Sequence, residues 1–420
     1  MEGEAAQTGG NLGFFQPREK AGREVSASAQ RKVSARSAWI LLPALGLFTI
    51  LMLAATTEVV ARRMFADGGS GVAPCMVFND PATGARGVPN STCIEKSPEN
   101  PPIEFQFNNC GHRAGMPCAP KAPGTYRIVM IGSSIPMGTR VQRGESFAAT
   151  LPFKLSKDTG RRVELYNESM GFGFSHSTTL RFHDVLSAQP DMILWIVTPM
   201  DVGRSSLILP VADLDPWAGM SVHAKAWNRL KVDLSSMSLS ETVDDLFNHT
   251  KTSVLLRHYL YQSETLYIRS FLAGPDHASG YLKQQLSPAW QSNLSQFESD
   301  AALMEAEAQK AGVPFVVTYV PERAQASMIS MGTWPAGYDP YSLPADVRSI
   351  IERHHGIYVD ILPDLRSVSN AGKFYYPVDG HPTPAGHALL SSLIEKGLTD
   401  GAIPALTNAS RTQLDAARGH

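Results

Sequence analysis

The segment from Tyr126 to Gly138, YRIVMIGSSIPMG, decides the fold of this chain. Its first seven residues form an apolar run that is rich in β-branched side chains and ends in Gly132, which is typical of a buried parallel strand. Ser133 and Ser134 follow directly, where a helix is expected to begin. Functional sites of parallel α/β domains form at the carboxyl ends of their strands, so this serine pair lies where a site is expected.

Four further segments are interpreted as strands, and stretches with helical spacing separate them. Strands that alternate with helices indicate a parallel sheet with helices on both faces. We therefore predict a doubly wound α/β domain, with a mainly parallel five-stranded sheet in a flavodoxin-like three-layer arrangement. The four segments are residues 162–167, 191–198, 313–320 and 356–361, and helices are expected near 146–157, 178–188, 291–310, 344–353 and 383–398.

The predicted domain covers residues 125–402, and residues 403–420 are interpreted as a C-terminal tail. Residues 202–290 break the alternation of strands and helices, because they mix Ser-rich and helical stretches. We interpret them as an insertion that packs over the sheet. The net charge of -2 gives no basic surface of the kind that nucleic-acid binding requires, so no nucleic-acid partner is expected.

The N-terminal part of the chain has the composition of a membrane anchor. Residues 1–37 are polar and predict a disordered cytoplasmic tail. The 21 residues from Ser37 to Thr57 carry no charge, which is enough to cross about 30 Å of hydrocarbon as a helix, and we predict a transmembrane helix over 38–60. A cleaved signal peptide or a buried core helix is the alternative, although the run is longer than a usual signal-peptide core and 36 residues precede it.

The distribution of basic residues predicts the orientation of this helix. Six Lys and Arg residues lie between Arg18 and Arg36, whereas Arg62 and Arg63 follow the apolar run. The excess before the run favours a cytoplasmic N-terminus. The chain from about residue 61 onward would then face the periplasm or the cell exterior, as a single-pass protein of the inner (cell) membrane.

The cysteines agree with an oxidising compartment. All four lie in residues 61–124, a lead-in rich in Pro, Gly and Asn, and they are Cys75, Cys93, Cys110 and Cys118. An even, clustered set predicts two disulfides. Three pairings are possible, and the local one joins Cys75 to Cys93 and Cys110 to Cys118. A zinc site is the alternative, but the cysteines form no CxxC pair and the spacings do not suit one, so no metal and no cofactor are expected.

Three segments carry residues suited to nucleophilic catalysis. Ser134 would gain from the free N–H groups of a helix start, although a serine there can also be a simple helix cap. In Asp379-Gly380-His381, the carboxylate could orient the imidazole, which would act as a base; the plain alternative is a polar turn. In NESMGFGF, residues 167–174, glycines would let backbone N–H groups approach an oxyanion, although an ordinary loop also favours Gly.

The order of these three segments resembles that of the SGNH (GDSL-like) hydrolase superfamily, over about residues 105–400. Phe107 to Arg113, FNNCGHR, together with the first strand is similar to bacterial, membrane-anchored extracytoplasmic members. The resemblance implies that Ser134 is the nucleophile and that Asp379 and His381 complete the triad. It also implies an oxyanion hole that includes the N–H groups of Ser134 and Gly171, with Gly173 as the alternative register.

The chain departs from the family pattern at two positions. Ser133 stands where the family has an Asp, which is not the catalytic acid. Met200 stands where the family has an Asn that donates to the oxyanion, and a Met side chain donates no hydrogen bond. Losing one such donor costs about 2.7–4 kcal/mol of transition-state stabilisation. Ser133, Gly173, His176, Met200 and Asp201 are candidates for the surrounding pocket, and Arg140 for contact with an anionic substrate.

Three functional hypotheses follow. The first is a serine esterase that acts outside the membrane and removes acetyl or other acyl groups from a cell-envelope or exported glycan. The second is a polysaccharide O-acyltransferase domain, which would require a multi-span partner to supply acyl groups across the membrane. The third is a non-catalytic glycan-binding or scaffold protein. The departures at Met200 and Ser133 favour it, and the intact set of Ser134, Asp379 and His381 opposes it.

Overall fold

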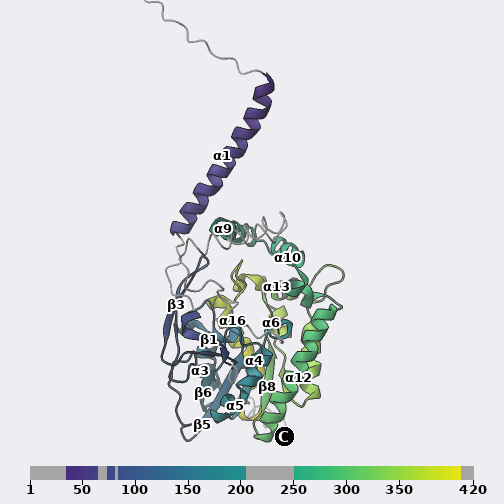
Figure 1. Cartoon of the computed structure of the whole chain (residues 1–420). Coiled ribbons are helices and arrows are strands. Elements are labelled where there is room, and N and C mark those ends of the chain that lie inside the picture. Colours follow the sequence, from purple (N-terminus) through teal and green to yellow (C-terminus); the bar gives the residue numbers. More distant parts are fainter. Residues whose placement is uncertain (1–34, 65–72, 81–83, 205–249, 408–420) are drawn as a thin grey trace, which may run out of the picture. The chain divides into compact units, whose positions relative to one another are not determined.

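The computed structural model of the chain describes residues 35–64, 73–80, 84–204 and 250–407 (Figure 1). The expected N-terminal tail lies almost wholly outside the described residues, as do residues 205–249 of the expected insertion and most of the C-terminal tail. The domain boundaries predicted from the sequence remain predictions.

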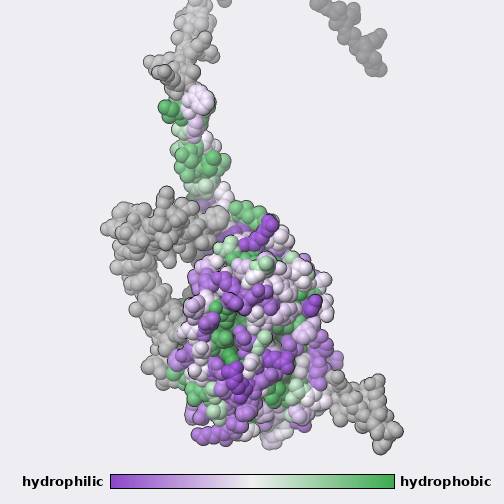
Figure 2. All heavy atoms as spheres, turned by 90° about the vertical axis from the view of Figure 1, so that its right-hand side faces the viewer, coloured by the Kyte–Doolittle hydropathy of each residue, from purple (hydrophilic) through white to green (hydrophobic). Residues whose placement is uncertain are grey.

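A single long helix, α1 (Ala35–Met64), contains the uncharged run. Within the described residues it is the one helix long and apolar enough to cross a membrane, over Trp39–Met64 with a mean hydropathy of 2.1. Its large apolar side chains are exposed, as the hydrophobic colouring of the helix in Figure 2 illustrates. The prediction of one N-terminal apolar helix is therefore confirmed.

The central sheet has five strands, and all its neighbouring pairs are parallel. The spatial order is β6-β5-β7-β8-β9, so the direction of chain progress reverses next to β5, which is where α/β sheets place their sites. The predicted doubly wound fold is confirmed. The strands are β5 (Thr125–Gly132), β6 (Arg162–Asn167), β7 (Met192–Val197), β8 (Phe315–Tyr319) and β9 (Ile357–Val359).

Helices follow the strands and cover the sheet. Helix α3 packs against β6 and α16, whereas α12 packs against α4, α6 and β8. Right-handed crossovers place α3 and α12 on opposite faces, because β5 to β6 and β7 to β8 step in opposite directions. In the described part of the domain the α-helices are α2 (Ser134–Met137), α3 (Phe147–Thr159), α4 (Ser175–Leu180), α5 (Phe182–Ser187), α6 (Pro199–Gly203), α9 (Lys251–Leu260), α10 (Glu264–Leu272), α11 (Asp276–Ser279), α12 (Pro288–Lys310), α13 (Arg323–Met331), α14 (Ser342–Arg353), α15 (Leu362–Arg366) and α16 (Pro384–Thr399).

The strands are buried because they are sandwiched between these helices. Every residue of β5, β7 and β8 is buried, which explains why their sequences are continuous apolar runs and not alternating patterns. Trp195 of β7 stacks on Phe297 of α12 with ring centroids 5.0 Å apart, and both side chains are fully buried. These contacts fix the α12 face of the sheet.

The lead-in forms two antiparallel hairpins, which the sequence analysis did not anticipate. The first hairpin pairs β1 (Met76–Asp80) with β2 (Gly84–Gly87), and the second pairs β3 (Thr92–Ser97) with β4 (Asn100–Gln106). The signal for the second hairpin is a short period-2 alternation, in which Ile103, Phe105 and Phe107 are buried and the intervening residues are more exposed. Three residues set in a Pro- and Asn-rich context were too few to predict a strand.

The hairpins pack on the domain around a small core of their own. Ile103, Phe105 and Phe107 share this core with Met137, at the end of α2, and with Met170, which follows β6. Arg113, which is buried, donates to the carbonyl oxygens of Met137 and Val141, and its guanidinium lies 4.0 Å from the centre of the Phe105 ring. The lead-in is thereby attached directly beneath the helix that begins with Ser134.

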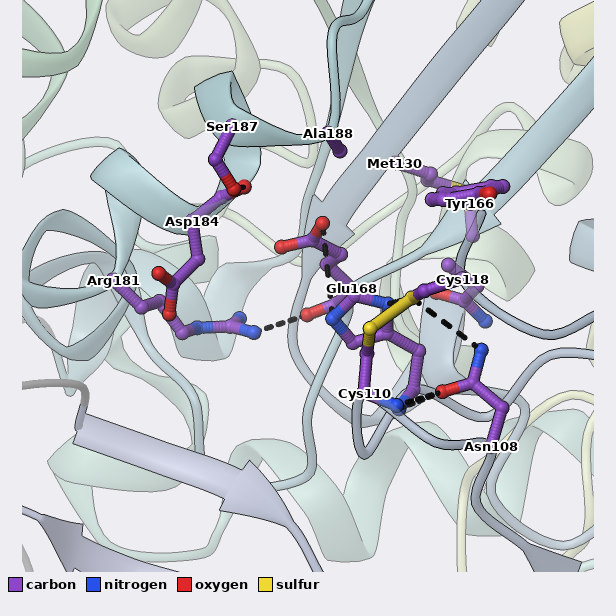
Figure 3. Close-up of polar contacts among 12 residues, drawn as sticks. Asn108, Cys110, Cys118, Met130, Tyr166, Glu168, Arg181, Asp184, Ser187 and Ala188 are labelled. Atoms are coloured by element: carbon purple, nitrogen blue, oxygen red, sulfur yellow. Dashed lines mark hydrogen bonds and ion pairs between the residues drawn. A yellow bond between two sulfur atoms is a disulfide. The ribbon is translucent and has the colours of Figure 1, made fainter. Parts of the chain in front are cut away.

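The structure joins Cys75 to Cys93 and Cys110 to Cys118, the local pairing expected from the sequence. Cys75–Cys93 connects the start of the first hairpin to β3 and is buried in the small core. Cys110–Cys118 closes a shorter loop beside Asn108, whose Oδ1 accepts a hydrogen bond from the Cys110 amide (Figure 3).

Replacing both Cys75 and Cys93 with Ala should lower the free energy of unfolding by about 3 kcal/mol, because a cross-link between residues 18 apart restricts the unfolded chain. Denaturant titration followed by tryptophan fluorescence measures the loss. Dithiothreitol should destabilise the parent protein more than the double variant. Equal stability of the two proteins under oxidising conditions would contradict this disulfide.

Candidate active site

The candidate nucleophile lies at the point where β5 ends. Ser134 is the first residue of α2, and Ser133 caps that helix through its backbone. Glycine at position 132 lets the end of β5 lie close to the backbone of β7, because a Cβ at this position would meet the carbonyl oxygen of Ile196 at 2.6 Å. Among the described residues, the Ser134 amide has no hydrogen-bond acceptor, as expected for the first residue of a helix.

Asp379 and His381 come from a loop that precedes α16. Gly380 separates them and has a φ of +82°, a conformation that glycine adopts readily and that lets the two neighbouring side chains converge. The loop is held by a hydrogen bond from the Tyr376 amide to the His381 carbonyl at 2.9 Å. Thr383 then caps α16 by accepting a hydrogen bond from the Gly386 amide.

The three side chains form one continuous hydrogen-bonded chain. His381 Nε2 lies 2.8 Å from Ser134 Oγ, and His381 Nδ1 lies 2.6 Å from Asp379 Oδ1. An ionised Asp accepts hydrogen bonds and donates none, so Nδ1 carries the proton and Nε2 is left to accept the serine hydroxyl. The geometry therefore matches the roles of nucleophile, base and orienting acid.

The surroundings of Asp379 keep it ionised. Burial opposes ionisation, but the charges and hydrogen bonds of His381 and Arg140 hold the pKa of Asp379 well below its usual range. Arg140 Nε donates to Asp379 Oδ2 at 2.8 Å. A permanently charged carboxylate is suited to stabilise an imidazolium at His381.

Gly171 lies in the loop after β6 and lines the same cavity as Ser134. Its amide donates to the Met137 sulfur at 3.0 Å. A thioether is a weak acceptor, so this N–H can turn to an oxyanion at little cost. Ser134 and Gly171 thus each bring a backbone N–H donor to the lining of one cavity.

A buried polar cluster fixes the loop that carries Gly171. The Glu168 amide donates to Met130 O at 2.8 Å, and the Met170 amide donates to Gly132 O at 2.9 Å. Arg181 donates to the Glu168 carbonyl oxygen, and Figure 3 shows the guanidinium directed at this residue. Burial raises the pKa of the Glu168 carboxyl to about 7, although the charge of Arg181 opposes the shift.

Ser133 and Asp201 form a buried connection between two strand ends. Asp201 Oδ2 accepts from Ser133 Oγ at 3.0 Å, and from the amide and hydroxyl of Thr198 at 2.8 and 2.6 Å. Burial raises the pKa of Asp201 to about 6, while the hydrogen bonds from Thr198 oppose the shift. These contacts tie the end of β5 to the end of β7.

The cavity next to Ser134 has a volume of about 630 Å³. Met200, at the start of α6, lines it together with Ser134, Gly171 and His381, whereas Ser133, Gly173, His176 and Asp201 are not among its lining residues. His176 instead lies on α4, with Nδ1 3.3 Å from the Asp300 carboxylate.

Other parts of the cavity wall were missed by sequence reasoning. Helices α9, α10 and α11, which belong to the expected insertion, contribute Arg257, Ser270, Phe271 and Ala278. Arg140 also lines the cavity. It was expected to contact an anionic substrate, but its guanidinium is paired with the carboxylates of Glu95 and Asp379. No sequence motif marks these positions, because their neighbours are distant in the chain.

No protein-family model matches the chain, and no curated protein matches it. Several solved structures do match the chain. An acetyl-xylooligosaccharide esterase from Geobacillus stearmophilus has 14% identity and a TM-score of 0.37, over 65% of this chain and 94% of that one. A psychrotrophic esterase from Pseudoalteromonas sp. has 11% identity and a TM-score of 0.34, over 65% and 97%.

A lipase/acylhydrolase from Enterococcus faecalis has 13% identity and a TM-score of 0.35, over 65% of this chain and 95% of that chain. Similar structures also include a GDSL-like lipase from Bacteroides thetaiotaomicron, with 12% identity and a TM-score of 0.28, over 65% and 87%. Two of these similar structures are described as a lipase/acylhydrolase and a GDSL-like lipase. The resemblance to the SGNH (GDSL-like) superfamily rests on the sequence motifs given above.

Replacing Met200 with Asn should raise the rate of ester hydrolysis about tenfold or more, because it adds a side-chain donor where an oxyanion develops. Met200→Ala is the matched control, since it shortens the side chain without adding a donor. Hydrolysis of a chromogenic ester at saturating concentration measures both. If Asn and Ala give the same rate, the side chain at position 200 does not reach the oxyanion.

Proposed function

We propose that this chain is a serine esterase whose nucleophile is Ser134. The observation that carries the proposal is the chain of hydrogen bonds from Ser134 through His381 to Asp379, at 2.8 and 2.6 Å. Spacing of this kind lets the hydroxyl lose its proton to the imidazole as it attacks a carbonyl. The two backbone donors near Ser134 further support acyl chemistry.

The proposed reaction runs in two halves. His381 Nε2 takes the proton of Ser134 while Oγ bonds to the acyl carbon, and the oxyanion is held by the amides of Ser134 and Gly171. The imidazolium, stabilised by Asp379, then protonates the departing alcohol and leaves an acyl-serine. In the second half, His381 deprotonates a water that attacks the acyl-serine, and the acid leaves.

The proposed substrate is an acylated glycan of the cell envelope or an exported glycan, and the group removed is acetyl or another acyl group. The volume of about 630 Å³ supports a substrate larger than the acyl group alone, because cavities of about 300–1,000 Å³ bury most of a drug-sized ligand. The apolar helix α1 supports a membrane-anchored enzyme, and the basic residues before it support a periplasmic or extracellular site.

The same acyl-serine could pass its acyl group to a sugar hydroxyl instead of water. The cavity supports this second reading, because α9, α10 and α11 extend its wall beyond the triad and leave room for an acceptor. An acyltransferase of this kind would depend on a multi-span partner for its acyl donor. A non-catalytic glycan-binding or scaffold role is the remaining hypothesis, supported by Met200.

A fluorophosphonate probe should label the full-length protein, and labelling should disappear in Ser134→Ala. Ser133→Ala is the matched control and should remain labelled, since Ser133 is bonded to Asp201. Gel fluorescence measures the adduct. A folded parent protein that resists the probe would favour the non-catalytic hypothesis.

Protease added outside intact spheroplasts should digest the domain that follows α1, because the proposed topology exposes it there. Immunoblotting with an antibody to the C-terminal half, beside a known periplasmic protein, measures the cleavage. A protected domain next to a digested periplasmic control would reverse the proposed orientation.

A further inference from the structure

We propose that the β3–β4 hairpin is a positioning element of the active site, in which Glu95, acting through Arg140, and Glu99 hold Asp379 in the orientation that His381 requires. The proposal rests on the proposed function. Glu95, Glu99 and Arg140 are proposed to act through Asp379 and not on the reacting atoms of the substrate.

The first contact is made through the side chain of Arg140. Its Nε donates to Asp379 Oδ2 at 2.8 Å, and its Nη1 lies 2.9 Å from Glu95 Oε1 on β3. Asp379 uses its other oxygen, Oδ1, for His381. Each oxygen of the carboxylate therefore has a separate partner, and rotation of the carboxylate would break one contact or both.

The second contact is made through the backbone. The Glu99 carboxylate, in the turn between β3 and β4, accepts from the Val378 amide at 3.0 and 3.1 Å and from the Asp379 amide at 2.7 Å. His258 Nδ1, from α9, lies 2.7 Å from the same carboxylate, and the Glu99 side chain is only 3% exposed. The hairpin thus holds both the side chain and the main chain of Asp379.

The backbone of Arg140 supports a dedicated role. Its φ is +69°, a region that residues with a side chain occupy only with strain and that tends to occur at functional sites. The Tyr376 hydroxyl donates to the Arg140 carbonyl at 3.2 Å. This contact links the strained residue to the loop that carries Asp379 and His381.

Electrostatics explains why Arg140 cannot be replaced by a neutral residue. Glu95 and Asp379 side chains are each 16% exposed, and Arg140 lies between them. Without the guanidinium, two largely buried carboxylates would repel each other across the site. Asp379 would then turn from His381 or become protonated, and in either case would stabilise the imidazolium less.

The test uses full-length protein in detergent micelles and the rate of fluorophosphonate labelling. Arg140→Ala should label about 10- to 100-fold more slowly, since small displacements of a catalytic group cost rate factors of this size. Millimolar guanidinium chloride should restore much of the rate, because Arg140 lines the cavity and its side chain is 22% exposed. Sodium chloride at the same ionic strength should not restore it.

Variants of Glu99 extend the test to the backbone contact. Glu99→Ala should also label slowly, but guanidinium should not rescue it, because the lost contacts are to amides. Glu99→Gln, which keeps one acceptor oxygen, should be intermediate. Arg348→Ala is the matched control: Arg348 forms an exposed ion pair with Glu352 on α14, and its loss should leave the labelling rate unchanged.

A second measurement does not depend on activity. The proton on His381 Nδ1 should give a low-field NMR resonance, assigned by its loss in Asp379→Ala, and it should disappear or shift in Arg140→Ala and Glu99→Ala. Wild-type labelling rates and an unchanged resonance in both variants would overturn the positioning role while leaving the proposed function intact.

If the parent protein does not label, the proposed function fails, but the resonance still tests the positioning role. Its loss in Arg140→Ala and Glu99→Ala would support that role. Its absence from the parent protein would refute it, because Asp379 would then not be held against His381.

Discussion

The hydrogen bond of 2.8 Å between Ser134 Oγ and His381 Nε2 is the contact on which this account depends. Its two residues are 247 positions apart in the sequence, so the whole domain has to fold before the bond can form. The parallel sheet accomplishes this by placing the end of β5 beside the reversal of strand order, and the loop that precedes α16 brings Asp379 and His381 to Ser134. The catalytic geometry therefore depends on the folding of the whole domain.

The described part of the lead-in, residues 61–124, packs against the elements that carry the site. Its hairpins share a small core with Met137, the last residue of the helix that begins with Ser134, and with Met170, which precedes Gly171. Arg113 fixes the carbonyls at the end of α2. Glu99 contacts the Asp379 loop directly, and Glu95 acts on it through Arg140. A segment that composition alone would describe as a linker therefore contacts the site from two sides.

Some of this could be predicted from the sequence, for physical reasons. Buried parallel strands have to be apolar on both faces, so β5, β7 and β8 are readable as continuous runs. The strand β6, which is partly exposed, was nevertheless predicted with the bounds that the structure gives. Asp379 and His381 were recognisable because the acid, the glycine and the base are adjacent. Glu95 and Glu99 were not, since an ion pair between distant segments leaves no local pattern, and Arg140 was expected to contact an anionic substrate and not Asp379. Met137 could not be foreseen as the acceptor of the Gly171 amide.

The measurement that tests the central claim most directly is the isolation of the acyl-enzyme. The full-length protein would be mixed with an activated acetyl ester, quenched in acid within seconds, digested and mapped by mass spectrometry. The account predicts an acetyl group on the peptide that begins after Arg127, with fragment ions that place it on Ser134. Acetylation of Ser133 instead, or steady ester turnover with no acyl adduct on this peptide, would contradict it.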